Sequence, residues 1–216
     1  MNTNPNAIKI LCYGDSNTWG RDPHGSGIRY HVNIRWTGQL QSKLGSNYWI
    51  IEEGLGGRTT VLEDPKRDGR NGLIYLKPCL ESHSPIDIII LMLGTNDFKA
   101  RFNQSLENIG KNIEELVKII YYFADVKNKK PLKLILLSPP YVDESVEGVK
   151  DNYSGAEEKS KKLATYYEQV AKKYNCEFID IAKIVKPSKI DGSHLDPSAH
   201  KAIADALGEK IKLIAP

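Results

Sequence analysis

Cysteine is scarce in this chain of 216 residues, where only Cys12, Cys79 and Cys176 are present. Their number is odd and they are widely spaced, so neither a disulfide framework nor a paired metal-ligand motif is predicted. Cys12 and Cys176 lie within or beside apolar runs and are expected to be small buried hydrophobic residues. A cytoplasmic location, where thiols stay reduced, is the simplest setting for such a chain.

Long apolar runs are also missing. The longest, residues 86–93, contains Asp87 and is far shorter than the roughly 20 apolar residues that cross a bilayer. The first six residues have neither the basic nor the apolar region of a secretory signal. A mature form from which such a signal has been removed stays an open alternative. The net charge is only +3, and the cluster of Lys127, Lys129 and Lys130 has no interleaved aromatic residues. This favours a solvated helix end over a nucleic-acid patch, so we expect no membrane and no nucleic-acid partner.

The sequence does contain a regular alternation of strand and helix patterns. Residues 86–93 and 132–137 are nearly continuous in Ile and Leu, as is typical of strands that are covered on both faces. Strands that alternate with helices predict a parallel sheet with right-handed crossovers. We therefore predict one three-layer α/β/α domain over residues 1–216, with strands at Ile8–Tyr13, Tyr48–Glu53, Ile86–Leu93, Leu132–Leu137 and Glu177–Ile181.

Helical periodicity lies between these strands. It is found at residues 36–44, 106–120, 163–174 and from 197 onward. Gly45 is placed to end the first of these helices. The last should begin at Asp196-Pro197, an N-cap aspartate before a first-turn proline. Residues 21–34 and 139–154 lack clear periodicity and follow carboxyl ends of strands, where open α/β sheets bind ligands, so we expect both to wall the substrate pocket.

Gly14-Asp15-Ser16-Asn17 directly follows the first strand pattern, and Ser16 is the candidate nucleophile. A serine hydroxyl needs a base to take its proton, and that base must be held in one tautomer. His194 is the best candidate for the base because Asp191 lies three residues before it in a glycine-containing loop. On their own, Asp191 and His194 fit equally well as caps of the last helix.

A serine hydrolase also needs hydrogen-bond donors for the oxyanion of its tetrahedral intermediate. The candidate donors are the backbone N–H groups of Ser16 and Gly57 and the side-chain amide of Asn96. Gly57 has no side chain to obstruct a ligand, and Asn96 follows the third strand pattern. Each fragment alone is more typical of a tight turn, but their joint occurrence in this order favours a catalytic site.

The four fragments resemble the four signature blocks of the SGNH, or GDSL-type, hydrolases. Gly14-Asp15-Ser16 matches the nucleophile block, Gly57 takes the place of the second block's glycine, Gly94-Thr95-Asn96-Asp97 matches the third, and Asp191-x-x-His194 the fourth. The resemblance covers nearly the whole chain. It implies catalytic roles for Ser16, Asp191 and His194 and an oxyanion hole of Ser16, Gly57 and Asn96.

Longer stretches are similar to a bacterial branch of this family, the aryl esterases that also act as acyltransferases. They include Gly-Asp-Ser-Asn-Thr-Trp-Gly from Gly14 and Met-Leu-Gly-Thr-Asn-Asp from Met92. The likeness implies a flavodoxin-like sheet of five parallel strands, no metal or other cofactor, and a homo-oligomer. Asn17 departs from the leucine usual there, and Gly56-Gly57 stands where that branch tends to carry Ser-Ala.

The resemblance leads us to expect a serine esterase for short, acetyl-type small-molecule esters that forms an acyl-serine intermediate. An apolar, narrow pocket would also allow acyl transfer to an alcohol. A carbohydrate acetylesterase, a lysophospholipase or a thioesterase of the same family are the alternatives.

Other residues near these fragments are weaker candidates. Trp19 and Phe98 could line an acyl or alcohol pocket, although aromatic residues near strand ends are more often core. Arg58 and Lys99 could contact an acidic substrate, but surface positions fit them better. Asp15 is expected to support the nucleophile turn by accepting nearby N–H groups.

Proteins of other classes are less well supported. A metal-dependent phosphoesterase would use Asp15, Asp97, Asp191, His194 and His200 as ligands. However, the residues directly after its first strand pattern, Gly14-Asp15-Ser16-Asn17, contain no Asp-x-His. A nucleotide-binding module would need the third glycine of the Gly-x-Gly-x-x-Gly fingerprint, but the residue at that position after Gly54-x-Gly56 is Thr59. A non-catalytic protein on the same scaffold would have little reason to keep all four catalytic groups.

Overall fold

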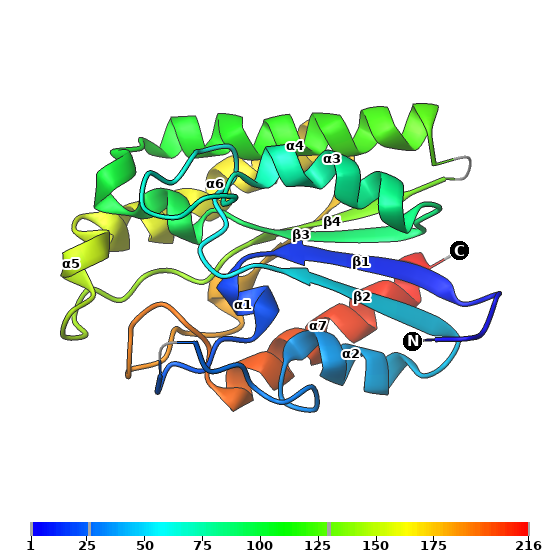
Figure 1. Ribbon diagram of the computed structural model, residues 1–216, viewed down its shortest axis with the longest axis horizontal. Coiled ribbons are helices and arrows are strands. Elements are labelled where there is room, and N and C mark those ends of the chain that lie inside the picture. The colour runs from blue at the N-terminus through cyan, green and yellow to red at the C-terminus, as the bar shows by residue number, and fades with distance from the viewer. Residues whose placement is uncertain (1, 26, 129–130, 216) are drawn as a thin grey trace.

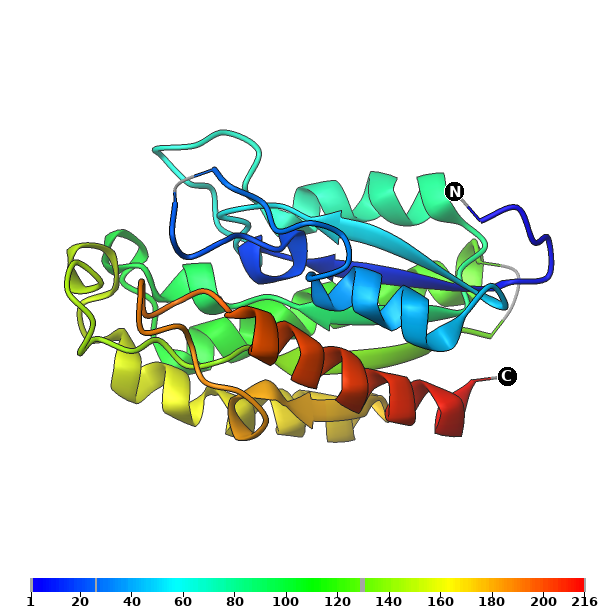
Figure 2. The ribbon, with the colours of Figure 1, turned by 90° about the horizontal axis from the view of Figure 1, so that it is seen from below.

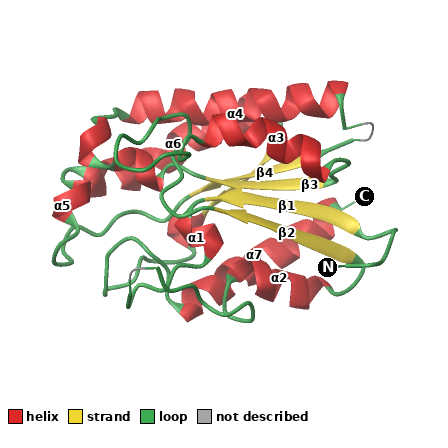
Figure 3. Ribbon diagram, viewed as in Figure 1, coloured by secondary structure: helices red, strands yellow, loops and turns green. Residues whose placement is uncertain are grey.

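The computed structural model describes residues 2–25, 27–128 and 131–215, so Lys129 and Lys130 of the basic cluster lie outside the described residues. Five parallel strands form one sheet in the order β2-β1-β3-β4-β5 (Figure 3), a flavodoxin-like order. The strands are β1 (Ile8–Gly14), β2 (Tyr48–Gly54), β3 (Ile88–Met92), β4 (Lys133–Ser138) and β5 (Glu177–Asp180). All five predicted strands are confirmed, with ends that differ by two residues at most.

Helices cover both faces of this sheet (Figure 1). One face carries α3 (Gly72–His83), α4 (Leu106–Val126) and α6 (Ala156–Tyr174), and the other carries α2 (Trp36–Leu44) and α7 (Pro197–Ile214) (Figure 2). Along β1, Leu11 and Tyr13 belong to the apolar core under α3, α4 and α6, whereas Ile10 and Cys12 belong to the core under α2 and α7. The three-layer α/β/α architecture is therefore confirmed, and it explains why the central strands are continuously apolar.

The sequence patterns do not predict α3. Its N-terminus is capped by the Asn71 side chain, which accepts the N–H groups of Leu73 and Ile74. Pro78 lies inside the helix and removes one backbone donor, and the Ile74 side chain is exposed. The helix is held to the sheet by Leu76 and other side chains of its inner face, so tertiary packing outweighs a poor local pattern.

Short elements gather at the carboxyl ends of the strands. They are α1 (Ser16–Trp19), η1 (Thr95–Phe98), η2 (Ala100–Phe102), α5 (Lys150–Tyr153) and η3 (Ile181–Lys183). Both chain termini lie at the other end of the sheet (Figure 1). Within residues 2–25, 27–128 and 131–215, none of the helices combines the length and apolar character needed to cross a membrane.

Candidate active site

Ser16 lies at the turn between β1 and α1. The Asp15 side chain accepts the Asn17 N–H at 2.9 Å and so caps the short helix that starts at Ser16. A Cβ on Gly14 would lie 2.1 Å from Thr18 Oγ1, so only glycine fits at the end of the strand. The turn leaves Ser16 7% exposed, on the wall of a cavity of about 520 Å³.

The structure brings Ser16, His194 and Asp191 together. His194 Nε2 lies 2.9 Å from Ser16 Oγ, and His194 Nδ1 lies 2.5 Å from Asp191 Oδ2. With Nδ1–H donated to Asp191, Nε2 is left as an acceptor for the Ser16 hydroxyl, which is the tautomer these partners select. Sequence positions 178 residues apart thus form one hydrogen-bonded chain.

Asp191 is held by more than the imidazole. Its Oδ1 accepts the backbone N–H groups of Ser193 and His194. Partial burial of Asp191 opposes the charged form, but the hydrogen bonds from His194 outweigh it and hold the pKa of this carboxyl below its usual range. The carboxylate is therefore ionised and able to stabilise a protonated His194.

Two contacts fix the loop that carries His194. The side-chain amide of Asn17 donates to the Ser193 carbonyl at 3.2 Å, which joins the nucleophile turn to this loop. The Asp143 N–H donates to the Gly192 carbonyl at 2.8 Å, which joins it to the segment after β4. Asn17 thus has a definite structural partner.

The three predicted oxyanion donors line the same cavity. Gly57 has a φ of +85°, a conformation that favours glycine. Among the described residues, neither the Ser16 N–H nor the Gly57 N–H has a hydrogen-bond acceptor. The Asn96 amide already donates to the Arg58 carbonyl at 3.0 Å and to Asp15 Oδ2 at 3.3 Å. A substrate oxygen would therefore have to replace or share the longer bond to Asp15.

Asp97, next to Asn96, faces the protein interior. Its carboxyl accepts the Thr60 N–H and hydroxyl. Burial, with the Asp15 carboxylate nearby, raises the pKa of Asp97 to about 7. These contacts tie η1 to the segment after β2 and fit a structural role.

Two of the predicted binding residues are not among those that line the cavity. Phe98 is 6% exposed and packs in the apolar core, and the Trp19 ring lies 5.3 Å from the Arg29 guanidinium. The expected pocket role of Trp19 and Phe98 is therefore corrected: one faces the core, and the other stacks on an arginine.

The expected surface position of Arg58 is also wrong. This residue is 3% exposed, its guanidinium lies 4.2 Å from the centre of the Tyr13 ring, and it donates to the Gly14 and Glu53 carbonyls. Stacking and carbonyl acceptors compensate for the buried charge. Lys99, in contrast, does line the cavity.

The walls of the cavity come partly from segments that the sequence patterns indicate. The segment after β4 contributes Glu147, Gly148, Val149, Asn152 and Tyr153, whereas the described residues of 21–34 (all but residue 26) contribute only Arg21. Lys66 and Arg67, on the loop between β2 and α3, were not predicted. No motif marks that loop, which bends back because the Thr59 N–H donates to the Arg70 carbonyl.

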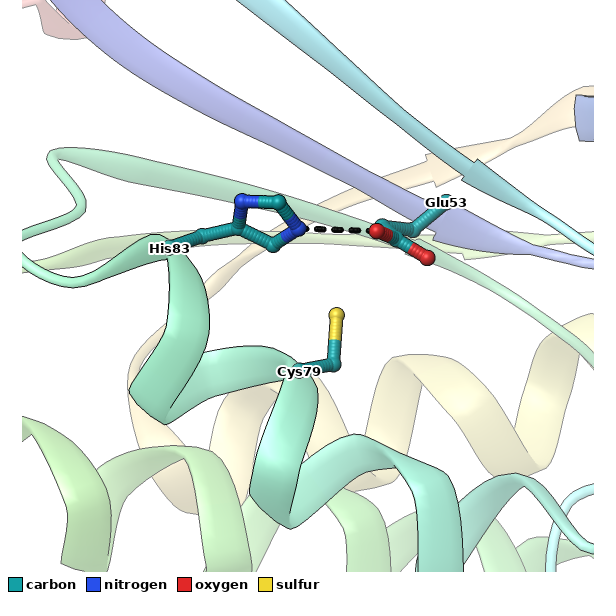
Figure 4. A group of neighbouring side chains, drawn as sticks. All are labelled: Glu53, Cys79 and His83. Atoms are coloured by element: carbon teal, nitrogen blue, oxygen red, sulfur yellow. Dashed lines mark hydrogen bonds and ion pairs between the residues drawn. The ribbon is translucent and has the colours of Figure 1, made fainter.

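A different group of side chains satisfies the spacing of metal ligands. Among the described residues, the potential ligand atoms of Glu53, Cys79 and His83 lie within 4.8 Å of one another (Figure 4). Glu53 and His83 already form a 2.8 Å hydrogen bond, and burial raises the pKa of the Cys79 thiol to about 12. The thiol is therefore protonated at neutral pH, and the group fits a structural link between β2 and α3.

The ligand set of the rival phosphoesterase does not assemble around one point. His200 lies on α7 with no exposed surface, its Nδ1 accepts the Trp36 N–H, and burial lowers its pKa to about 4. Asp97 is bound to Thr60 as described above. Within the part of the chain that the structure describes, these carboxylates and imidazoles do not form a metal-type cluster.

A hydrogen-bonded serine, histidine and aspartate at the carboxyl ends of a five-stranded parallel sheet is an arrangement of serine hydrolases. The chain belongs to the GDSL-like Lipase/Acylhydrolase family, whose sequence model matches residues 12–202. The protein is therefore an esterase or acylhydrolase of this family.

Two solved esterase structures and one curated esterase are similar to this chain over most of its length. The solved aryl esterase of M. smegmatis is 34% identical, with 96% of this chain and 100% of that chain covered and a TM-score of 0.90. A carbohydrate acetylesterase from Sinorhizobium meliloti is also 34% identical, with 95% and 99% covered and a TM-score of 0.89. An acetylxylan esterase of Xylanibacter ruminicola is 26% identical over 224 residues, 95% of this chain and 43% of that protein. The chain thus spans less than half the length of this curated relative.

Proposed function

We propose that this protein hydrolyses short, acetyl-type carboxylic esters through an acyl-serine intermediate. The observation that carries the proposal is the 2.9 Å contact between Ser16 Oγ and His194 Nε2, with Asp191 on the other ring nitrogen. A nucleophile, a base and a group that orients the base are the minimum set for this chemistry. Both Ser16 and Asp191 lie within hydrogen-bond distance of the His194 ring.

The reaction has two steps. Ser16 Oγ attacks the ester carbonyl while His194 Nε2 takes the hydroxyl proton, and Asp191 stabilises the resulting imidazolium. His194 then gives that proton to the leaving alkoxide, which departs as the alcohol and leaves an acyl-serine. A water molecule, deprotonated by His194, attacks the acyl group, and the proton returns to Ser16 Oγ as the acid leaves.

Three donors would hold the tetrahedral oxyanion. The Ser16 and Gly57 N–H groups need no rearrangement, because no described residue accepts from them. Asn96 would become the third donor by turning its weaker bond from Asp15 to the substrate. Preorganised donors of this kind stabilise charge that develops only in the transition state.

The relatives support acetyl esters as the substrate class. Two of them carry carbohydrate acetylesterase and acetylxylan esterase in their names, so an acetylated carbohydrate is the second candidate substrate. Acyl transfer was expected for an apolar pocket, but charged and polar side chains together make up most of the lining of this one. We therefore propose hydrolysis as the main reaction.

The test is turnover of 4-nitrophenyl acetate by purified variants. Ser16→Ala and His194→Ala should each reduce kcat by several orders of magnitude, given about a millionfold loss for the corresponding changes in one protease. Ser193→Ala is the matched control, because its hydroxyl lies 3.3 Å from His194 Nδ1, on the side that Asp191 occupies. The control should keep most of the activity. Equal activity of Ser16→Ala and the parent protein would refute the proposal.

A further inference from the structure

The cavity beside Ser16 is lined by an excess of cationic side chains. Its basic residues are Arg21, Lys66, Arg67, Lys99 and Arg101, whereas its acidic residues are Glu147 and Asp191. Asp191 is already bound to His194. A cleft lined by charge of one sign concentrates ligands of the opposite sign.

Most of these cations have no carboxylate partner among the residues that the structure describes. Arg101 is the exception, since it forms two hydrogen bonds of 3.1 and 2.7 Å with Asp64. Among the described residues, no carboxylate lies within ion-pair distance of Arg21, Arg67 or Lys99. The Arg21 Nε is buried and has no hydrogen-bond acceptor there. Donors left without acceptors at a cavity wall fit a site that is completed by a ligand.

Arg67 lies directly against the candidate oxyanion hole. Its Nη1 is 2.8 Å from the point where a Cβ on Gly57 would lie, so the guanidinium fills the space that the missing side chain leaves. A guanidinium binds carboxylate or phosphate with two parallel hydrogen bonds. An anionic group of the substrate could therefore bind here while the ester carbonyl lies at Ser16.

Lys99 provides a second charge on the same wall. It is half-buried, and its Nζ lies 6.0 Å from the centre of the Tyr153 ring. Burial, together with the neighbouring Arg101 guanidinium, lowers the pKa of Lys99 to about 8. Both effects disfavour the charged form of Lys99, and an anion bound beside it would favour that form.

We propose that the ester substrate of this protein carries a second, anionic group, a carboxylate or phosphate, which Arg67 and Lys99 bind beside the oxyanion hole. The inference rests on the proposed function and specifies its substrate. Arg21 also lines the cavity and would bind an anionic group that is placed differently in the substrate. The anion can belong to the alcohol or to the acyl part of the ester, and matched probes distinguish the two.

The experiment compares kcat/KM for two pairs of esters. In the first pair, 4-acetoxybenzoate and its methyl ester, the charge lies in the alcohol part. In the second, phenyl hydrogen glutarate and phenyl methyl glutarate, it lies in the acyl part. Uncatalysed rates are subtracted, and the ratio of anionic to neutral kcat/KM is the readout. Because parent and variants are compared on the same pairs, intrinsic differences in ester reactivity cancel.

Arg67→Gln and Lys99→Met should each lower the ratio about tenfold or more in at least one pair, as expected for the loss of a charge-assisted hydrogen bond. Lys118→Met is the control, since Lys118 lies on α4 and pairs with Glu114 and Glu115 outside the cavity. Its ratio should equal that of the parent. Added salt should lower the parent's ratio as well.

The pH dependence gives a second readout. As pH rises through about 8, Lys99 loses its proton, so the parent's ratio should fall there and the fall should be absent in Lys99→Met. His194 acts on both members of a pair, so its contribution cancels in the ratio. The charged and titratable groups that face Lys99 are Arg101, Arg67, Asp64, Asp15 and Tyr153.

The outcomes separate this inference from the proposed function. If neutral probes are hydrolysed in a Ser16-dependent way but the two variants leave both ratios unchanged, the inference is wrong and the proposed function stands. If no probe is hydrolysed in a Ser16-dependent way, both are wrong. A lowered ratio in either variant, with the Lys118→Met ratio unchanged, supports both.

Discussion

Replacing Asp191 by asparagine tests whether this carboxylate keeps His194 in the tautomer that accepts the Ser16 proton. Asparagine can keep an oxygen where Oδ1 accepts the Ser193 and His194 N–H groups, so the loop should keep its shape. Its NH₂ group would then face His194 Nδ1 in place of Oδ2. Because that group donates, Nδ1 must become an acceptor and the ring proton moves to Nε2. The imidazole then can no longer accept the Ser16 proton.

The size of the effect follows from this change of tautomer. The same substitution in a serine protease lowers kcat about 10⁴-fold, which corresponds to about 5.5 kcal/mol of transition-state stabilisation. We expect a loss of this order in Asp191→Asn. The thermal unfolding midpoint should change little, since both backbone hydrogen bonds persist.

The assay is steady-state hydrolysis of an aryl acetate together with a thermal unfolding scan. Asp196→Asn is the matched control, because Asp196 lies five residues on in the same segment and its side chain makes no cap hydrogen bond at the start of α7. Its kcat should stay close to that of the parent. An Asp191→Asn protein with parental kcat would refute the role assigned to this carboxylate, and a large loss of stability would show that its role is structural.

Four further outcomes are expected. Asn96→Ala should reduce kcat about 10²–10³-fold if the amide holds the oxyanion, whereas a change confined to KM would limit it to substrate binding. Asn17→Leu removes the bond to the loop of His194 and also a buried oxygen that lacks a partner. Its unfolding midpoint should therefore change little while kcat falls by up to about 100-fold through misplacement of the base, and parental kinetics would contradict this. Hydrogen bonding by Lys189 lowers the pKa of Asp143 to about 2, so this pair stabilises the fold above about pH 4 and ceases to do so as pH falls towards 2. The difference in unfolding midpoint between the parent and Asp143→Asn should vanish over that range. Finally, the resemblance to the aryl esterase branch predicts a homo-oligomer in size-exclusion chromatography with light scattering, and a monomer would contradict it.

Periodicity in the sequence was enough to locate the strands and four of the helices. Ile88 and Ile135, for example, lie in strands covered on both faces, and such strands leave a continuous apolar run that is easily recognised. Helix α3 was missed because Pro78 interrupts its pattern and its apolar residues Ile74 and Tyr75 are exposed. Its position is determined by contacts with the sheet, which no local pattern records.

The candidate site was predictable only where a motif constrains the backbone. The turn at Ser16 and the Asp191–His194 loop have strict geometric needs and therefore recognisable residues. Arg58 was wrongly predicted to lie at the surface. Its charge is buried because the Tyr13 ring and two backbone carbonyls serve as its partners, and the sequence pattern does not reveal these contacts. Arg67 could not be found at all, because its approach to Gly57 depends on how a loop without a motif returns over the sheet.

The central claim is that Ser16 becomes acylated because His194 removes its proton. The most direct measurement is intact and peptide mass spectrometry after treatment with a fluorophosphonate, a reagent that labels activated serines. The account predicts a single adduct on the peptide containing Ser16, its absence in Ser16→Ala and a much slower reaction in His194→Ala. An adduct on any other residue, or equal labelling of the His194→Ala protein, would contradict it.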